Sequence, residues 1–410
     1  MRTILAPLRI PDYRRLLISN GLWWQARWME NIAVGWLVLE MTDSAWHVAL
    51  VGFFRMAPLL VGGFFSGMVA DRFGRRAVII FSQTVNVIVP AVVVFLIVTK
   101  LLVFWHVAVV ATLMGAVWAL DWPTRRSILP DLVGKDRTMD GMLLEGFFQN
   151  TSRIIGPFLG GTIVKLLGVP GCFAAVAVFA ASGLVILLGL SKSDAPPRGS
   201  RDHRPWKAIA DGIRYIRHDQ TILGVFLITV VMNNLLFPYM TLLPVFARDV
   251  LGQGPIGFGL LGACQGVGSL VGLFLVSGTR HFWKPTWIFA TGSFFQSVML
   301  VAFAASVSFP LSVSLLFLSG LAQASFGVMQ STIVLLSAKD EMRGRTMGAV
   351  NFAIGLGSLG RIEVGALASA FGAPLAVGVA CGASALLVLL ITAGLPGFRN
   401  KRDLGPSKHF

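Results

Sequence analysis

Charged residues are scarce in this sequence, and acids are scarcer than bases. Only 13% of the 410 residues are charged, with 19 Asp and Glu against 34 Lys and Arg, whereas 55% are hydrophobic. The hydrophobic residues form runs of about 20, the length that a helix needs to cross a bilayer. A membrane-spanning backbone must satisfy its own hydrogen bonds, which selects helices here. The composition therefore predicts an all-α polytopic membrane protein.

Cysteines and enzyme motifs are also lacking. Cys172, Cys264 and Cys381 are far apart in apolar segments without metal-ligand spacing, so we expect buried thiols and no metal site. P-loop, nucleophile-elbow, zinc-protease and dinucleotide-binding motifs do not occur in a supporting context. These absences argue against an enzyme, against a cofactor and against transport driven by an ATPase domain on this chain.

Twelve apolar segments are long enough to span a membrane. They are Leu16–Glu40, His47–Ala70, Ala77–Thr99, Leu102–Trp122, Gly141–Leu166, Pro170–Leu190, Thr221–Ala247, Ile256–Gly278, Thr286–Val307, Leu311–Leu336, Thr346–Phe371 and Pro374–Leu395. The first is too long for the apolar core of a signal peptide and lacks a small-residue cleavage site. We therefore expect it to be a retained span.

Basic residues alternate from loop to loop, which predicts the orientation of the chain. If the N-terminus is cytoplasmic, most of the 34 Lys and Arg lie inside, and only Lys100, Lys165 and Arg248 lie in outer loops. This asymmetry is the positive-inside pattern. It predicts a multi-pass membrane protein with both termini in the cytoplasm, and it explains the net charge of +15 without nucleic acid.

Three weak matches at a spacing of 208 residues suggest an internal repeat: Arg72 with Arg280, Thr138-Met139 with Thr346-Met347, and Arg153-Ile154 with Arg361-Ile362. Six apolar segments lie on either side, which favours two pseudo-symmetric six-helix bundles. The expected boundaries are 1–190 for the first bundle, 191–220 for a cytoplasmic linker with an amphipathic surface helix, 221–396 for the second bundle and 397–410 for a cytoplasmic tail.

The loop after the second apolar segment reads GMVADRFGRR. It resembles the G-x-x-x-D-R-x-G-R-R loop motif of the major facilitator superfamily through Gly67, Asp71, Arg72, Gly74, Arg75 and Arg76, with Ala77 in place of a further base. The phrases WLVLEMTDSA, ALDWPTRRSILPDLV, RIIGPFLGG, LLPVFARDVLG and MRGRTMG are similar to those of bacterial drug and siderophore exporters, such as enterobactin exporters and macrolide efflux proteins of the transmembrane secretion effector type. The resemblance covers nearly the whole chain, and it implies a bacterial inner membrane.

The resemblance implies a role for two motifs. Residues 67–76, here called the latch, are expected to hold the two halves together in one conformation, with Asp71 near the positive N-terminus of the eleventh helix. A topogenic arginine cluster with a capping aspartate is the alternative. Gly156, Pro157, Gly160 and Gly161 match the end of the antiporter motif in the fifth helix, although its upstream glycines are missing.

Charged residues within apolar segments are costly in a membrane, so they are candidates for function or for structural ion pairs. Depth along the helices predicts a cluster of Glu30, Arg27 and Arg55, with Glu30 as the best proton carrier. The full set of proton and substrate candidates is Glu30, Arg27, Arg55, Glu145, Arg153, Asn233, Asn234, Tyr239, Gln323, Arg361 and Glu363. The polar members are equally explained as interhelical hydrogen-bond partners.

Together these patterns predict a proton-coupled exporter of small amphipathic molecules that works by alternating access. An importer or uniporter of the same fold remains open, as does a transporter-like receptor without turnover. The expected partners are a small-molecule substrate and the lipid bilayer, and we expect a monomer driven by the proton gradient, without nucleic acid.

Overall fold

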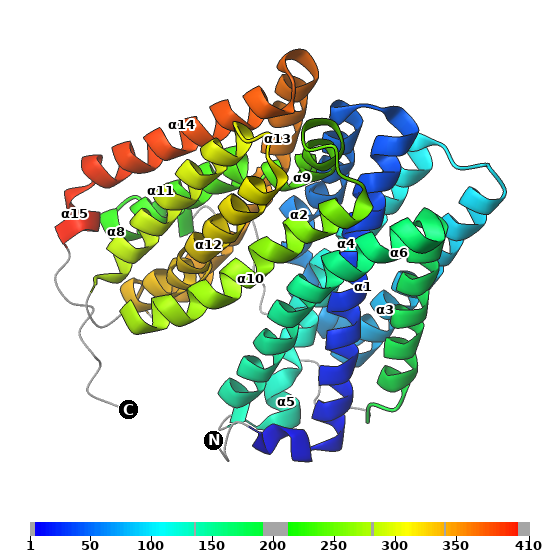
Figure 1. Cartoon of the computed structure of the whole chain (residues 1–410). Helices are drawn as coiled ribbons and strands as arrows, with labels where there is room; N and C mark the ends of the chain where they lie inside the picture. Colours follow the sequence, from blue (N-terminus) through cyan, green and yellow to red (C-terminus); the bar gives the residue numbers. More distant parts are fainter. Residues whose placement is uncertain (1–4, 135–136, 192–211, 280–282, 340–341, 401–410) are drawn as a thin grey trace. The chain divides into compact units, whose positions relative to one another are not determined.

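The computed structural model describes residues 5–134, 137–191, 212–279, 283–339 and 342–400, apart from the side chains of residues 61–68, 70, 71, 279, 399 and 400. Residues 401–410 of the predicted tail and residues 192–211 of the predicted linker therefore lie outside the described residues. The described chain is helical throughout (Figure 1). It forms an N-terminal unit, Met1–Arg201 with Ala247–Ala263, and a C-terminal unit, Asp202–Phe246 with Cys264–Phe410.

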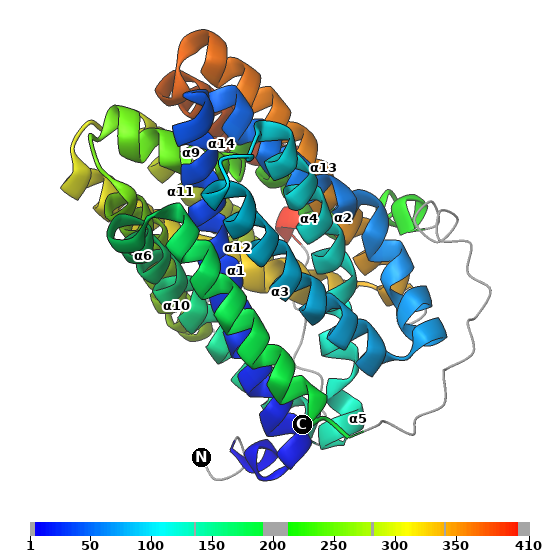
Figure 2. The ribbon, with the colours of Figure 1, turned by 90° about the vertical axis from the view of Figure 1, so that its right-hand side faces the viewer.

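The N-terminal unit is built from six α-helices and a short 3-10 helix. They are η1 (Ala6–Arg9), α1 (Pro11–Thr42), α2 (Ala45–Phe73), α3 (Arg75–Val98), α4 (Phe104–Ser127), α5 (Leu129–Val133) and α6 (Thr138–Leu188). The first part of α10 (Pro255–Thr279) also belongs to this unit. Figure 2 shows α1, α3 and α6 side by side, and α2 packs on α4.

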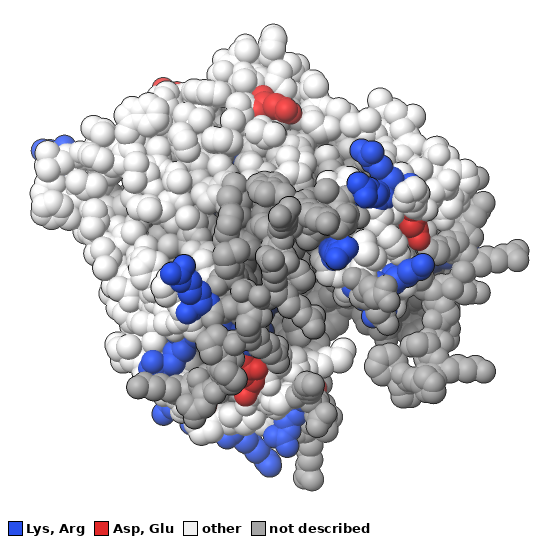
Figure 3. All heavy atoms as spheres, turned by 180° about the vertical axis from the view of Figure 1, so that it is seen from behind, with Lys and Arg blue, Asp and Glu red and all other residues white. Residues whose placement is uncertain are grey.

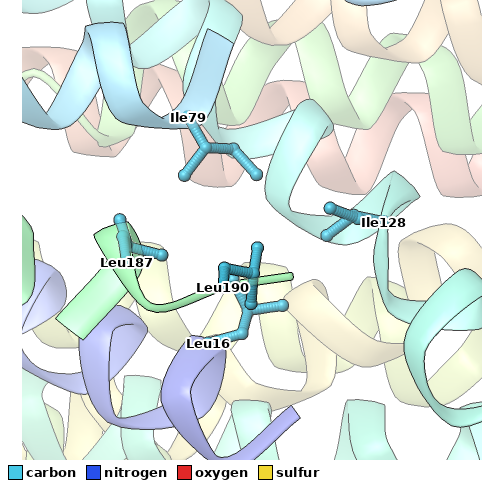
Figure 4. Close-up of a cluster of buried hydrophobic side chains, with 5 residues drawn as sticks. All are labelled: Leu16, Ile79, Ile128, Leu187 and Leu190. Atoms are coloured by element: carbon cyan, nitrogen blue, oxygen red, sulfur yellow. The ribbon is translucent and has the colours of Figure 1, made fainter. Parts of the chain in front are cut away.

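Glycine permits the closest helix contacts of this unit. A Cβ on Gly160 of α6 would meet the Cα of Met29 in α1 at 3.0 Å, and one on Gly115 of α4 would meet the carbonyl carbon of Arg55 in α2 at 2.9 Å. At the end of the unit that holds the α1 N-terminus, an apolar cluster joins α1, α3, α4 and α6 (Figure 4). Its members are Leu16, Ile79, Ile128, Leu187 and Leu190.

Gly168 divides α6 into the two spans that the sequence predicts. It has φ 71° and ψ 177°, whereas the residues around it are helical. A side chain is strained at positive φ, so glycine is suited to this sharp change of direction. The two parts of α6 correspond to the predicted segments Gly141–Leu166 and Pro170–Leu190.

Nine helices of the described chain are long and apolar enough to cross a membrane, with α6 counted once. The charged and tryptophan-rich α1 is not among them, and only Ala45–Leu60 of α2 qualifies as a shorter apolar helix. The observed helices coincide with all twelve predicted segments to within a few residues, except at the end of α4. Twelve spans nevertheless remain a prediction.

The π-helix η4 (Phe246–Val250) begins in the C-terminal unit and continues into the N-terminal unit. The C-terminal unit contains the remaining helices. They are α8 (Gln220–Val231), the π-helix η3 (Met232–Leu236), α9 (Tyr239–Val245), the rest of α10, α11 (Pro285–Ala304), α12 (Phe309–Ser337), α13 (Arg343–Phe371), α14 (Ala373–Gly394) and α15 (Pro396–Asn400). Within this unit α11 packs on α12 and α14, and α13 packs on α14 and η3. The predicted seventh span is thus interrupted by a π-helical turn, a feature that often marks functional segments.

One face of α3 shows how the surface suits a bilayer. Its exposed apolar residues recur at helical spacing, and they are Phe81, Ile88, Val92, Phe95 and Val98. The molecular face in Figure 3 likewise has broad areas without Lys, Arg, Asp or Glu. Large exposed apolar surfaces of this kind are expected to contact lipid.

The two units differ in one place from the predicted domain boundaries. Ala247–Ala263 groups with the N-terminal unit, because Arg248 forms an ion pair with Asp43 and Gly259 packs closely on Pro157 of α6. Segment 247–263 lies within the predicted second bundle. The predicted boundaries remain a prediction.

Candidate functional site

A buried ion pair joins α1 to α2. The Arg55 guanidinium Nη2 lies 3.1 Å from Glu30 Oε2, and Glu30 and Arg55 are 2% and 7% exposed. The close contact of α2 with Gly115 of α4 places the Arg55 backbone, and the helical rise places Glu30 at the matching level of α1. The structure thus brings together the two residues that depth along the helices predicts as partners.

Glu30 borders a small internal pocket. The pocket is lined by Trp23, Ala26, Arg27, Glu30, Asn86, Met114, Val176 and Ala180, which come from α1, α3, α4 and α6. The space open to the centre of a water molecule is about 10 Å³, which is room for roughly one water. Glu30 is therefore a buried carboxylate beside a polar, water-sized space.

Arg27 lies one turn before Glu30 and points to aromatic rings. Its guanidinium carbon is 4.1 Å from the centroid of the Trp118 ring and 6.0 Å from that of Trp23. Such contacts stabilise an arginine by about 0.5–2 kcal/mol. No hydrogen bond or ion pair within the described residues reaches the Arg27 side chain.

A second buried network surrounds Arg125, which the sequence places in a cytoplasmic loop. That prediction is wrong: α4 continues through Pro123 to Ser127, and Arg125 is 0% exposed. Its three donors reach different acceptors. Nε lies 2.9 Å from Asp121 Oδ2, Nη1 lies 2.8 Å from Asn20 Oδ1, and Nη2 lies 2.7 Å from Gln83 Oε1.

The network of Arg125 reaches all four long helices around it. Gln83 of α3 donates to the Ala180 carbonyl of α6 at 2.8 Å, and Asn20 of α1 donates to Glu145 of α6 at 3.4 Å. Glu145, a predicted proton candidate, is therefore buried at the margin of this network. A guanidinium with every donor group bonded is well suited to fix the packing of helices.

The predicted antiporter-like motif in α6 serves mainly as a packing surface. Gly156 lies against Trp28, Gly160 against Met29, and Gly161 against the Pro255 backbone. Arg153, one turn earlier, lies with its guanidinium carbon 5.8 Å from the Trp28 ring. The motif therefore sets how closely α1 approaches α6, on the helix that carries Arg27 and Glu30.

The described part of the latch is tied to its own unit. Arg75 donates to the Ser127 carbonyl at 2.7 Å and forms an ion pair with Asp131, and Arg76 donates to the Leu190 carbonyl at 3.0 Å. Gly74 has φ 82°, a conformation that favours glycine. Arg72 lies over the Phe73 ring.

The side chains of Gly67 and Asp71 lie outside the described residues. The expected contact of Asp71 with the eleventh helix therefore remains a prediction.

The predicted candidates in the C-terminal unit are dispersed. Asn233 and Asn234 donate to carbonyls one turn earlier in their own helix, each at 2.9 Å. Gln265 donates to the Tyr239 hydroxyl and, at 3.2 Å, to Gln323 Oε1. These three side chains form one polar cluster within the unit.

Arg361 and Glu363 are not brought together as a buried pair. Arg361 is half-buried and donates to the Gly357 carbonyl at 2.6 Å, whereas Glu363 is exposed. Of the candidates predicted from the sequence, Glu30 and Arg27 line the pocket found in the described chain, and Arg55 is joined to it through its ion pair with Glu30.

Comparison with known proteins assigns the chain to a family. The sequence profile of the transmembrane secretion effectors matches residues 2–410. The chain belongs to this family of the major facilitator superfamily. The resemblance stated from the loop motif is thus confirmed, and this transmembrane secretion effector is a multi-pass membrane transporter and not an enzyme.

Relatives with known names carry substrates of different kinds. The chain is 25% identical over 360 residues to the staphyloferrin A transporter of Staphylococcus aureus, covering 86% of this chain and 89% of the relative. It is 26% identical over 351 residues to the multidrug efflux pump Tap of Mycolicibacterium fortuitum, covering 83% and 85%. A crystal structure of the peptide transporter POT has a TM-score of 0.76 at 14% identity, covers 94% of each chain and supports the fold alone.

Proposed function

We propose that this transmembrane secretion effector exports small amphipathic molecules in exchange for protons, and that Glu30 carries the proton. The observation that carries the proposal is the position of Glu30. It is 2% exposed, held by the Arg55 guanidinium at 3.1 Å, and beside a pocket with room for a water molecule. The efflux function named for the relative Tap supports the direction of transport.

A proton on Glu30 would act on the packing of α1 and α2. A carboxylate buried this deeply is stable only when it is paired or neutral. Protonation removes the negative charge that holds Arg55, so proton binding weakens the link between the two helices. A conformation in which Arg55 has moved away would then be favoured by the proton, which is the linkage that alternating access requires.

The test is Glu30→Gln in inverted membrane vesicles. Dyes, antibiotics and siderophores are first screened for uptake into vesicles that contain the wild-type protein. With a transported compound, the Gln variant is expected to fold, to bind the compound and to lose pH-gradient-driven uptake, while exchange of compound across the membrane continues. Gln keeps the size of Glu and one carbonyl acceptor, but it carries no charge and cannot take up a proton.

Glu363→Gln is the matched control, because Glu363 is an exposed acid of α13. It is expected to keep wild-type pH dependence. Uptake by Glu30→Gln that still follows the pH gradient would show that another group carries the proton. Movement of the compound only in the opposite direction would favour an importer, and binding without movement would favour a receptor.

The latch is proposed to set the rate of the conformational change. Asp71→Asn is expected to slow transport about two- to fivefold while expression and ligand binding persist, because a charge at a helix terminus contributes about 0.3–1 kcal/mol. Initial transport rates in proteoliposomes with equal protein content provide the measurement. A rate equal to that of the wild type would contradict a latch role and leave the arginines as topology signals.

A further inference from the structure

We propose that the pocket beside Glu30 recognises an uncharged carbonyl oxygen of the transported molecule and rejects charged groups of either sign. This inference rests on the proposed function and names the chemistry of its substrate. It follows from the donors that line the pocket, from the charges around them and from the size of the space.

The pocket has hydrogen-bond donors without acceptors. Arg27 is one of the residues that line the pocket, its guanidinium carbon lies 4.1 Å from the centroid of the Trp118 ring, and no hydrogen bond or ion pair within the described residues reaches its side chain. Asn86, which is 8% exposed, lines the same pocket, and its amide Nδ2 has no partner. Buried donors are almost always satisfied, so the buried Asn86 amide without a partner, next to a charged Arg27 at one small space, indicates an acceptor that arrives with a ligand or with water.

The acids near Arg27 are already engaged by other arginines. Glu30 and Asp121 act electrostatically on Arg27. Glu30 forms its ion pair with Arg55, and Asp121 forms one with Arg125 at 2.9 Å. The positive charge of Arg27 is therefore compensated only at a distance, and neither acid forms an ion pair with it in the described residues.

The charged residues around the pocket decide which chemical group of a ligand can bind there. A ligand cation would face Arg27 and the nearby Arg55, which repel it at short range. A ligand carboxylate would be attracted by Arg27 but would share the pocket with the carboxyl group of Glu30, and two carboxylates held this close repel each other. An uncharged carbonyl oxygen accepts from Arg27 and Asn86 and avoids both penalties.

Size and lining agree with this assignment. The space of about 10 Å³ fits a single oxygen atom of a ligand in place of one water. Ala26, Met114, Val176 and Ala180 supply apolar walls for the carbon atoms next to it. A carbonyl oxygen in this space would leave no room for a water molecule beside Glu30, so ligand and proton access would exclude each other, as exchange transport requires.

The experiment uses one aromatic scaffold with three head groups. Binding of 2-naphthamide, 2-naphthoate and 2-naphthylmethylamine to the purified full-length protein is measured by calorimetry without any gradient. The wild type is expected to bind the amide at least about tenfold more tightly than the anion or the cation, a ratio typical of one charge-assisted hydrogen bond. Absence of amide binding up to its solubility limit would overturn the proposal.

Two substitutions should change the selectivity in opposite ways. Arg27→Met is expected to weaken amide binding about tenfold and to admit the amine, whereas Glu30→Gln is expected to admit 2-naphthoate. Arg126→Met is the matched control, because the Arg126 guanidinium lies 4.1 Å from the Trp122 ring, as Arg27 lies from Trp118, but outside the pocket lining. It should leave the three affinities unchanged.

The outcomes separate this proposal from proton coupling. If Arg27→Met lowers thermal stability but keeps the ratio of amide affinity to amine affinity, Arg27 is structural and the proposal fails.

Asn86→Asp provides a second variant. It is expected to fold, because its carboxylate would be attracted by Arg27, which lines the same pocket, and it should abolish the preference for the amide. If it binds the amide as the wild type does, the proposal is overturned. Loss of pH-driven uptake in Glu30→Gln is measured separately and bears only on the proposed function.

Discussion

Replacing Arg125 by Lys is expected to abolish transport and to destabilise the N-terminal unit by about 1–3 kcal/mol for each buried acceptor that loses its donor. Arg125 is fully buried and serves three acceptors on three helices: Asp121 in α4, Asn20 in α1 and Gln83 in α3. A lysine ammonium is compact and lacks the planar fork that reaches all three. Acceptors left without donors in a dry interior lose their full hydration energy.

Thermal unfolding of the detergent-purified protein, followed by size-exclusion chromatography, measures this loss. The control is Arg126→Lys, since Arg126 is the next residue of α4 but is exposed and stacked over Trp122. The control is expected to lose less than about 1 kcal/mol. Equal stability of the two lysine variants would mean that the buried network does not hold the helices together.

A double variant refines the interpretation. Arg125→Met leaves the Asp121 carboxylate buried and unpaired, whereas Arg125→Met with Asp121→Asn removes both charges. The double variant is expected to regain part of the lost stability, because an uncompensated charge costs more than a missing ion pair. If the two substitutions simply add, Arg125 and Asp121 are not coupled in the folded state.

The helices of this protein could be predicted from its sequence because each apolar run meets a single physical requirement, the thickness of the bilayer. The ion pair of Glu30 and Arg55 was also predictable. Two opposite charges at equal depth in consecutive helices have few other partners, and the structure places them 3.1 Å apart. The end of α4 was missed, because Pro123 and the following arginines are typical of a loop, whereas the helix continues to Ser127.

The rest of the candidate site depends on contacts that a linear sequence does not reveal. Asn20, Gln83 and Asn86 are single polar residues in apolar runs, and each could face any neighbouring helix. Only the packing of α1, α3, α4 and α6 assigns two of them to Arg125 and one to the pocket. The sequence did contain one signal of the buried arginine. Arg125 and Arg126 are consecutive, so on a helix they point in different directions and only one of them is expected to face the other helices.

Gly115→Val is expected to eliminate transport and to cost about 3 kcal/mol of stability, at the upper end of the range for an overpacked core. An added Cβ at Gly115 would lie 2.9 Å from the Arg55 carbonyl carbon and 3.3 Å from its Cα, and closer still to its carbonyl oxygen. These are backbone atoms, so α2 must move away from α4 to make room. The movement carries Arg55 away from Glu30, so the substitution acts on the pocket without touching a charged residue.

Gly146→Val in α6 is the control, because an added Cβ there meets no atom within 4 Å. It is expected to change stability by less than about 1 kcal/mol, since only helix propensity differs. Gly115 and Gly146 both lie in apolar segments of the sequence, and only the structure distinguishes the crowded Gly115 from the open Gly146. Similar stability of the two valine variants would contradict the close approach of α2 to α4.

A double-mutant comparison then links Gly115 to the pocket. If the valine separates Arg55 from Glu30, adding Glu30→Gln to Gly115→Ala, a milder variant that retains measurable transport, should change the pH dependence little further. Neighbouring residues that act through one contact show such non-additive effects. A full additional loss in the double variant would mean that Gly115 acts on stability alone, and that the packing of α2 on α4 does not control the charge state at Glu30.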